Sequence, residues 1–523
     1  MKTTYIKPQD ILIILLASLL LAASFATIQS GDLTAGFPGF FVLFFLSLLF
    51  LKLAYGWSGG GRMLSVLIGL AFVLRLGVGV ALYVGLPAYG HGDADDRAGY
   101  VFTDAHNRDN QAWMLATSPQ PILDAFSRKY ATDQYGGLLA FNSTIYRYLS
   151  PDAQRPLMLI LFSAFFAAVG VPFLWKAVIQ VFGGEVAWAS TWIFVSFPES
   201  VLLGASAMRE PYLLTFSAFT LWGFVQLFHQ SERRQSGWIW LGLGLLGMLL
   251  VSPAVAIFTL IIFAGWIFFA NEQRRISWQV IAAVAVVFVL GLLLLSSSLN
   301  RSGQFEAASP LHVVNDWLKS AVKWDAYQLE RESGWVQKLF DEMPPWMRLP
   351  FVAVYGMLQP VLPATFMKPT VLIWKWIGFL RAAGWYAILP FLILSFVAAA
   401  GARSRQTRNL LLWLALLVWA WILLAALRGG GDLFDNPRYR TILFLWQSIL
   451  AGYTWVWWRE TRSVWVWTVI LMELVFTVIF TFWYGSRYYH WPGQLPFAGM
   501  VALILGLWLL VLGGGWWLNK RRA

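Results

Sequence analysis

The sequence predicts an all-α polytopic membrane protein with about fourteen transmembrane helices. The first observation is composition: 59% of the 523 residues are hydrophobic and 12% are charged. The second is the recurrence of apolar runs long enough to cross roughly 30 Å of hydrocarbon as helices. The third is that the basic residues of the short connections follow the alternation expected of cytoplasmic loops. A soluble globular protein and a disordered protein are therefore excluded.

Most of the expected spans are single apolar runs. They begin near Ile11, Pro38, Met63, Pro156, Val186, Glu210, Gln279, Trp385, Leu410, Thr441, Val464 and Phe497. Two shorter runs, Trp238 to Val251 and Ala254 to Ala270, are divided by Ser252 and Pro253. Because proline removes a helical hydrogen bond, we predict two helices that meet at this point.

Orientation follows from Lys and Arg in the short connections, which are retained in the cytoplasm. With the N-terminus inside, every inward connection is basic: Lys52 with Arg62, Lys176, Arg233 with Arg234, Arg274 with Arg275, Arg403 with Arg405 and Arg408, Arg459 with Arg462, and Lys520 to Arg522. Both termini are then cytoplasmic in a multi-pass protein of the cytoplasmic membrane. The net charge of +12 is explained by topology and attraction to anionic lipid, so nucleic acid is not an expected partner.

The first apolar run follows Lys2 and Lys7 and has an alternative interpretation as a signal peptide. We favour an uncleaved span, because its removal would upset the alternation of basic loops. The chain has no cysteine, which excludes disulfides and thiolate metal sites.

We expect one membrane domain, residues 1–523, with two large outward loops at 90–155 and 299–383. The first loop gathers carboxylates beside the bilayer, where charge is costly and usually marks a functional site. The second loop mixes tryptophans with charged residues, a pattern typical of interfacial helices. Its last part, 351–383, is apolar but interrupted by prolines, which indicates an interfacial or re-entrant hairpin.

Candidate acids lie in the first loop. Helical periodicity runs from Asp109 through Trp113 to Ala116, so Asp109 is expected at a helix N-terminus that stabilises its charged form. An ordinary N-cap is the alternative interpretation. Further along, Asp133, Gln134 and Tyr135 precede a glycine pair and an amphipathic helix, which we expect to lie along the interface and to cover a cleft.

Candidate basic groups are expected on the same side of the membrane as the acids of the first loop. Arg438, Tyr439 and Arg440 follow a glycine-rich turn and open a helix, where a flexible loop would present guanidinium groups to a lipid phosphate at the outer surface; simple anchoring is the alternative. Arg209 and Glu210 open another helix and either pair or reach into the cleft.

For two further arginines we favour structural roles. Arg381 is interpreted as a headgroup anchor at the end of a span. Arg75 lies inside the third span and requires a buried carboxylate, carbonyl or water as its partner.

A metal site in the first loop is a weaker hypothesis. Carboxylates and imidazoles there supply suitable ligands, namely His91, Asp93, Asp95, Asp96 and His106. Their spacing fits no defined metal motif, so a solvated acidic loop is favoured and a cofactor is not expected. The sequence also has no Walker loop, HExxH, GxSxG or dinucleotide fingerprint in a supporting context.

The acidic first loop, the helix with Asp109, Trp113 and Ala116, and the late segment PRYRTILFLWQSILAG together resemble the GT-C superfamily of lipid-dependent membrane glycosyltransferases. The likeness is to the family 39-like group, which includes protein O-mannosyltransferases and the aminoarabinose transferase of lipid A. Two features depart from that group. The acidic loop follows the third span instead of the first, and the expected second acid is Asn110, so Asp104 is kept as a second candidate base.

The resemblance implies a GT-C-like fold and transfer of a sugar, with inversion, from a polyprenyl-phosphate donor to a lipid, glycan or protein acceptor at the outer face. Asp109 or Asp104 would accept the acceptor proton. Arg438 and Arg440, with Arg209, would stabilise charge on the leaving phosphate. The alternatives are a polysaccharide polymerase or ligase acting on polyprenyl-pyrophosphate glycans, and a lipid or solute transporter.

Overall fold

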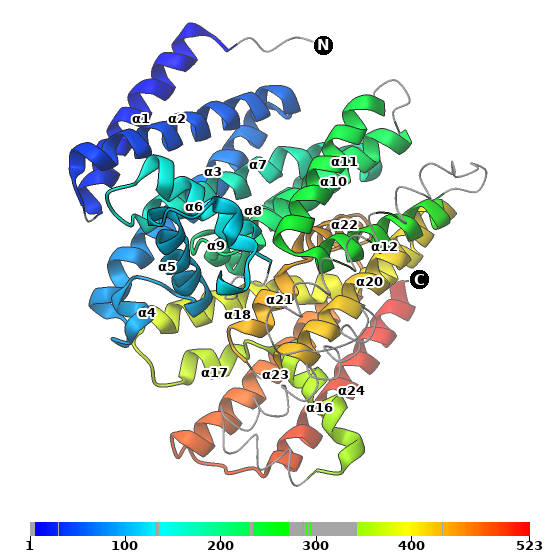
Figure 1. Cartoon of the computed structure of the whole chain (residues 1–523). Coiled ribbons are helices and arrows are strands. Elements are labelled where there is room, and N and C mark those ends of the chain that lie inside the picture. The colour runs from blue at the N-terminus through cyan, green and yellow to red at the C-terminus, as the bar shows by residue number, and fades with distance from the viewer. Residues whose placement is uncertain are drawn as a thin grey trace. The chain divides into compact units, whose positions relative to one another are not determined.

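The computed structural model describes residues 6–29, 31–130, 135–229, 234–270, 286, 289, 293, 343–430 and 432–522 of the chain. All elements of regular secondary structure among these residues are helices (Figure 1). Within them, nine helices are long and apolar enough to cross a membrane. They are α1 (Pro8–Ile28), α2 (Leu33–Ser58), α3 (Gly61–Tyr89), α7 (Pro156–Phe182), α10 (Glu210–His229), α18 (Leu372–Ile393), α20 (Arg405–Gly429), α23 (Val464–Tyr488) and α24 (Phe497–Arg522). The protein is therefore a multi-pass membrane protein, as predicted.

A tenth span forms only if two helices are counted together. The pair α8 (Gly184–Ser196) and α9 (Pro198–Gly204) is bent by 54°. The bend lies where Pro198 begins the second helix, since a proline cannot continue the hydrogen bonding of the first. The span predicted from Val186 is thus a broken one.

The count of about fourteen spans is not confirmed. The run near Gln279 lies outside the described residues. The short pair α11 (Arg234–Val251) and α12 (Pro253–Ala270) meets at Ser252 as expected, but each helix is short for a span. The run predicted from Thr441 forms α22 (Phe444–Thr461), which is too polar to be counted because it includes Gln447 and ends in charged residues.

The chain divides into two compact units. Unit 1 comprises residues 1–196, 200–322 and 441–445, and unit 2 comprises residues 197–199, 323–440 and 446–523. In unit 1, α7 packs against α2, α3, α8 and α10, and 78% of its apolar window is buried. Since lipid-facing helices need no such burial, α7 is the central helix of this unit. The helices α1 and α2 form a hairpin at its edge, drawn in blue in Figure 1.

Glycines allow α10 and α11 to pack closely. A Cβ at Gly223 would lie 2.4 Å from the backbone nitrogen of Leu241, and a Cβ at Gly244 would lie 2.6 Å from the carbonyl oxygen of Phe216. Small residues at such contacts let two backbones approach, which is how helices gain packing energy where lipid offers no hydrophobic driving force.

Arg75 satisfies the expectation for a buried charge in α3. Its Nη1 donates to the carbonyl oxygens of Ala71 (3.1 Å) and Val195 (3.3 Å), and its Nη2 donates to Ser200 Oγ (3.0 Å). Gly204 leaves room for it, because a Cβ there would lie 2.6 Å from Arg75 Cδ. The side chain therefore joins helices of unit 1, in the structural role predicted.

The first predicted loop folds as helices within unit 1. They are α4 (Ala94–Arg97), α5 (Thr103–Thr117), the 3₁₀ helices η1 (Ile122–Phe126) and η2 (Arg128–Tyr130), and α6 (Gly137–Leu149). The last of these is the expected amphipathic helix, which buries Leu139, Asn142 and Tyr146 on one face. Arg147 of α6 donates to the carbonyl oxygens of Leu115, Ala116, Ser118 and Gln120. A cation at the C-terminal carbonyls of α5 fixes these two helices together.

Unit 2 contains α16 (Pro345–Leu358), α17 (Leu362–Met367), α18, α19 (Ser395–Ala400), α20, α21 (Asp435–Thr441), most of α22, α23 and α24. The helix expected near Trp385 begins at Leu372, inside the predicted outward loop, because no proline interrupts 370–389. Only 11% of the apolar window of α24 is buried, and this helix packs on α23.

Candidate functional site

Asp109 lies in the middle of α5, which corrects the prediction of an N-terminal position. The helix begins at Thr103, after Phe102 in an extended conformation, so Asp104 occupies its first turn and is exposed. Polar residues between Thr103 and Asp109 concealed the true start, because their sequence shows little apolar periodicity. The structure thereby excludes an N-cap role for Asp109.

The Asp109 carboxylate is buried, with 2% of the residue exposed, and both of its oxygens accept hydrogen bonds from phenols. Tyr100, from the turn between α4 and α5, donates to Oδ2, and Tyr146 of α6 donates to Oδ1. Gln154 lies next to this cluster and donates from Nε2 to Asn110 Oδ1 at 3.1 Å. Buried carboxylates need such partners, and two phenol donors from two segments fix this one in place.

Burial raises the pKa of Asp109, and the hydrogen bonds from Tyr100, Tyr146 and Gln154 offset part of that effect. The net direction is upward, which makes the ionised form a stronger base than an ordinary aspartate. Burial and the neighbouring Asp109 likewise raise the pKa of both tyrosines, so they stay protonated as donors.

A small pocket adjoins this carboxylate. Its lining includes Asp109, Tyr100, Asn142 and the segment 205–207, and its free space accommodates about one water molecule. The site therefore pairs a buried titratable group with a position that a water or a hydroxyl can occupy.

The turn that carries Tyr100 is held by an aspartate–histidine pair. His106 Nδ1 lies 2.7 Å from Asp95 Oδ1, and Thr103 Oγ1 donates to Asp95 Oδ2 at 2.5 Å. The His106 ring stacks on the Tyr100 ring, with centroids 4.6 Å apart and an interplanar angle of 12°. Trp113 packs edge-on against Tyr146 at 5.6 Å. Both phenols are thus positioned by aromatic neighbours.

The other candidate metal ligands have structural partners. Asp93 caps α4 by accepting from the Asp96 amide at 2.8 Å, and the buried Asp96 accepts from the His91 amide at 2.5 Å. Among the residues that the structure describes, no three His, Asp or Glu side chains are grouped so as to hold a metal ion.

Arg209 and Glu210 pair with each other at the start of α10, one of the two predicted arrangements. Arg209 Nε lies 3.7 Å from Glu210 Oε1, and Glu210 is fully buried. The Arg209 guanidinium also lies 5.6 Å from the centre of the Tyr135 ring. Asp133 and Gln134, predicted beside Tyr135, lie outside the described residues.

Arg381 is buried in unit 2, which corrects its interpretation as a headgroup anchor. Its Nε donates to Glu199 Oε2 at 2.5 Å and its Nη2 donates to Glu199 Oε1 at 3.0 Å, with 3% and 2% of the two side chains exposed. The guanidinium also stacks on the Phe434 ring at 4.8 Å. Snorkelling fails because α18 starts well before Arg381, so this position lies inside the helix and faces packed neighbours.

Arg438 and Arg440 are also buried, with 5% and 2% of each residue exposed, so they do not lie on an exposed flexible loop as predicted. Arg438 Nη1 lies 3.3 Å from Asp435 Oδ1. Arg440 donates to the carbonyl oxygens of Gln359 (3.0 Å) and Met357 (3.4 Å), and its guanidinium carbon lies 3.4 Å from the centre of the Trp385 ring. The short helix α21 orders this segment and turns both side chains inward.

Tyr439, between these arginines, forms an aromatic link. Its ring lies 4.6 Å from the Arg428 guanidinium and 5.8 Å from that of Arg438. Its carbonyl oxygen accepts from Trp421 Nε1 at 2.9 Å, which ties α21 to α20.

Sequence reasoning missed the partners of both clusters. Tyr100 and Tyr146 lie tens of residues apart in the sequence, and no spacing rule links both of them to Asp109. One feature of the sequence could have identified Tyr146 as a buried residue, namely its place on the apolar face of the predicted amphipathic helix. The sequence could also have indicated that Glu199 is paired, because a carboxylate within an apolar run needs a partner.

No family model and no curated protein matches this chain. Among solved structures, it is similar to the archaeal oligosaccharyltransferase AglB from Archaeoglobus fulgidus, in complex with an inhibitory peptide and a dolichol-phosphate. The TM-score is 0.38 and the sequence identity 13%, with 86% of this chain and 55% of that chain covered. The chain thus spans about half the length of that protein, and at this level the similarity carries no argument about individual residues.

Proposed function

We propose that this protein is a glycosyltransferase that moves a sugar from a polyprenyl-phosphate-linked donor to an acceptor hydroxyl or amine at the outer face of the cytoplasmic membrane. The observation that carries the proposal is the buried Asp109 carboxylate beside a water-sized pocket in a multi-pass membrane protein. The resemblance of the first loop and of PRYRTILFLWQSILAG to GT-C enzymes supports the same assignment.

Asp109 is the proposed general base. Burial raises its pKa, which makes the ionised carboxylate a stronger base than that of an ordinary aspartate. As the acceptor oxygen or nitrogen forms its bond to the anomeric carbon, Asp109 takes the proton and the bond to the lipid phosphate breaks. Attack opposite the leaving group inverts the anomeric centre.

The present pocket is too small for a sugar, so the proposed reaction requires the turn that carries Tyr100 to move. Tyr100 is the donor best suited to leave, since it belongs to a short turn, whereas Tyr146 belongs to α6. Its departure would release Asp109 Oδ2 for the acceptor proton. Exposed Asp104 remains the second candidate base.

Arg440 is the proposed group for the lipid phosphate in unit 2. Arg381 forms a direct ion pair with Glu199, whereas Arg440 donates to two backbone carbonyls and lies on the Trp385 ring. A guanidinium so held keeps its charge in a poor solvent and matches the geometry of a phosphate. Arg438, Tyr439 and Arg209 stay as proposed contributors to substrate binding.

The test is a transfer assay in nanodiscs with radiolabelled polyprenyl-phosphate sugars and a membrane extract as acceptor. Asp109→Asn should lower the transfer rate at least about a hundredfold, and Asp124→Asn, an acid of the same loop outside the pocket, should leave it unchanged. Loss with Asp104→Asn instead would move the base to Asp104. If both acids are replaceable, or if only pyrophosphate-linked glycans are consumed, the proposal fails, and the second result supports a polymerase or ligase.

A further inference from the structure

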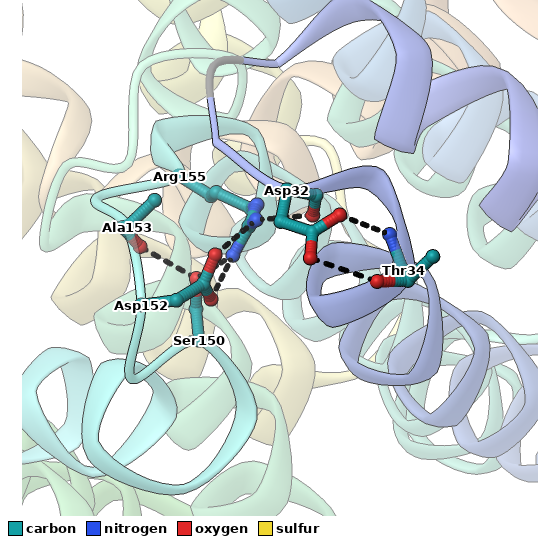
Figure 2. Close-up of polar contacts among 6 residues, drawn as sticks. All are labelled: Asp32, Thr34, Ser150, Asp152, Ala153 and Arg155. Atoms are coloured by element: carbon teal, nitrogen blue, oxygen red, sulfur yellow. Dashed lines mark hydrogen bonds and ion pairs between the residues drawn. The ribbon is translucent and has the colours of Figure 1, made fainter.

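Buried polar side chains need hydrogen-bond partners, and Arg155 of unit 1 shows the usual arrangement. Only 1% of this residue is exposed. Figure 2 shows its guanidinium held by the Ser150 hydroxyl, the Asp152 carboxylate and the Asp32 carbonyl oxygen, at 2.6–2.8 Å. Such partners offset the loss of water around a buried polar group. A buried polar side chain that lacks them and lines a pocket is therefore a candidate ligand group.

Asn142 of α6 differs from Arg155 in this respect. Only 2% of the residue is exposed, yet its carboxamide forms no hydrogen bond with any residue that the structure describes. The next residue, Ser143, is satisfied within the helix, because its Oγ donates to the Leu139 carbonyl oxygen at 2.8 Å. Burial of an amide without a partner costs free energy, so a contribution to stability does not explain Asn142.

The Asn142 side chain lines the pocket beside Asp109. Asn142 lies four residues before Tyr146, hence on the same face of α6, and Tyr146 donates to Asp109 Oδ1. Tyr100, which donates to Oδ2, also lines this pocket. One face of α6 thus supplies a donor to the carboxylate and, one turn earlier, a carboxamide at the same pocket.

We propose that Asn142 is a ligand-binding residue, and that its carboxamide and the Asp109 carboxylate together hold one hydroxyl group in this pocket. The free space matches one water molecule, and a buried water or hydroxyl needs two or more polar partners. Ser206, another polar residue of the lining, is already engaged, because its Oγ donates to the Leu202 carbonyl oxygen at 2.7 Å. The existence of this site does not depend on the proposed function, whereas its role in transfer rests on it.

The two groups favour a hydroxyl over an amine. A carboxylate only accepts hydrogen bonds, whereas a carboxamide both donates and accepts them. A hydroxyl has two lone pairs, so one accepts from Asn142 Nδ2 while the other attacks the anomeric carbon. A neutral amine has one lone pair, which the new bond uses, and an ammonium ion has none. In the transfer step the hydroxyl proton passes to Asp109, the oxygen–carbon bond forms, and the bond to the lipid phosphate breaks with its electron pair on the phosphate.

The first measurement detects the site without a substrate. Radiolytic footprinting of the full-length protein in nanodiscs generates hydroxyl radicals from bound water, and mass spectrometry locates the side chains that they label. Leu159 lines the pocket and is 1% exposed, whereas Leu161 of the same helix is 0% exposed and lies outside the lining. We expect faster labelling of Leu159, and Asn142→Leu should lower its rate toward that of Leu161, because apolar cavities stay dry. Equal rates in the wild type, or an unchanged Leu159 rate in the variant, would overturn the site.

Unfolding by sodium dodecyl sulfate separates ligand binding from a structural role. Asn142→Leu should not lower the detergent concentration at the unfolding midpoint, because it removes a buried amide that has no partner in the described part of the chain. Asn436→Leu is the matched control. Asn436 is 1% exposed and its Nδ2 donates to the Gly430 carbonyl oxygen at 2.9 Å, so the same substitution should lower the midpoint. Equal losses in both variants would assign Asn142 a structural role and refute the inference.

The transfer assay decides whose hydroxyl the pocket holds. Label in the membrane extract reports attack by an acceptor hydroxyl, and free labelled sugar reports attack by water. Asn142→Leu should lower one of these rates about tenfold, the effect of one lost hydrogen bond to the reacting oxygen, and Asp124→Asn should change neither. Unchanged rates in Asn142→Leu, or a product linked through nitrogen, would refute its role in the reaction.

Two further arrangements keep the test decisive. If Asn142→Leu does not fold, Asn142→Val, which is smaller and equally apolar, decides by the same criteria. If the wild type neither transfers nor hydrolyses, the proposed function fails, whereas the labelling of Leu159 still tests the hydroxyl site.

Discussion

Because the Glu199–Arg381 pair is buried, we expect substitutions of these two residues to have large and strongly non-additive effects on the free energy of unfolding. Glu199→Gln leaves the guanidinium inside packed protein with the Phe434 carbonyl oxygen at 3.3 Å and the Phe434 ring as its remaining contacts. At 3 Å and an effective dielectric constant near 20, the lost attraction is about 5 kcal/mol. Removal of one partner of a buried pair costs about 3–5 kcal/mol in measured cases, so we expect a loss in that range.

Arg381→Met should cost a similar amount, because it leaves the Glu199 carboxylate buried without its partner. The double variant Glu199→Gln/Arg381→Met should recover most of the loss, since neither charge then has to be desolvated. The assay is a double-mutant cycle, with unfolding by sodium dodecyl sulfate in mixed micelles and helicity as the readout.

The Lys52–Asp10 pair provides a matched control. It has a comparable distance of 3.0 Å, but 34% and 27% of its side chains are exposed. Lys52→Met should therefore change stability far less than Arg381→Met, because solvent screens the pair. If the two substitutions have equal, small effects, Arg381 is a solvated anchor and the burial described for α18 is wrong.

Four further predictions follow from single contacts. Asp109→Asn should lower the transfer rate at least about a hundredfold, because it removes the general base. It should not lower stability, because it removes a buried charge that is costly to desolvate. Tyr146→Phe should move the acidic limb of the pH–rate profile upward by about one unit, because it removes a donor to the ionised Asp109. Arg147→Met should destabilise unit 1 by about 2 kcal/mol in the same unfolding assay, through the uncapped α5 carbonyls. Gly244→Val should cost about 2 kcal/mol or more, because its Cβ would meet the Phe216 carbonyl oxygen.

The effect of pH on stability has a defined sign. The pKa of folded Asp109 lies above the unfolded value of about 3.9, so folding favours its protonated form. The stability gained in this way is fully present below the unfolded pKa and is lost as pH rises through the folded pKa. Asp109→Asn should remove this pH dependence and Tyr146→Phe should extend it to higher pH. Profiles of these variants that coincide with the wild type would contradict the assignment of Asp109 as a buried, titrating group.

Local patterns predicted most of the elements. The helices that contain Ile11, Pro38, Met63, Leu410 and Phe497 form as spans, because an apolar run of that length has no other stable conformation in hydrocarbon. The break at Ser252 and the amphipathic helix after Tyr135 also form as expected, since proline and apolar periodicity act within one or two turns. The predicted start of α5 was wrong because the polar residues there show no apolar periodicity. The predicted start of α18 was wrong because the prolines up to Pro369 concealed the helix that begins at Leu372.

The sequence by itself determined that this is a multi-pass helical membrane protein and that its first loop concentrates acids beside the bilayer, because hydrophobicity and charge act through composition and near neighbours. Only the tertiary structure decided what each charge contacts. Arg381, Arg438 and Arg440 point into packed protein, and Asp109 is held by Tyr100 and Tyr146 from two separate segments. The cost of an unpaired buried charge selects these partners, and that selection depends on distances that exist only after the helices have packed.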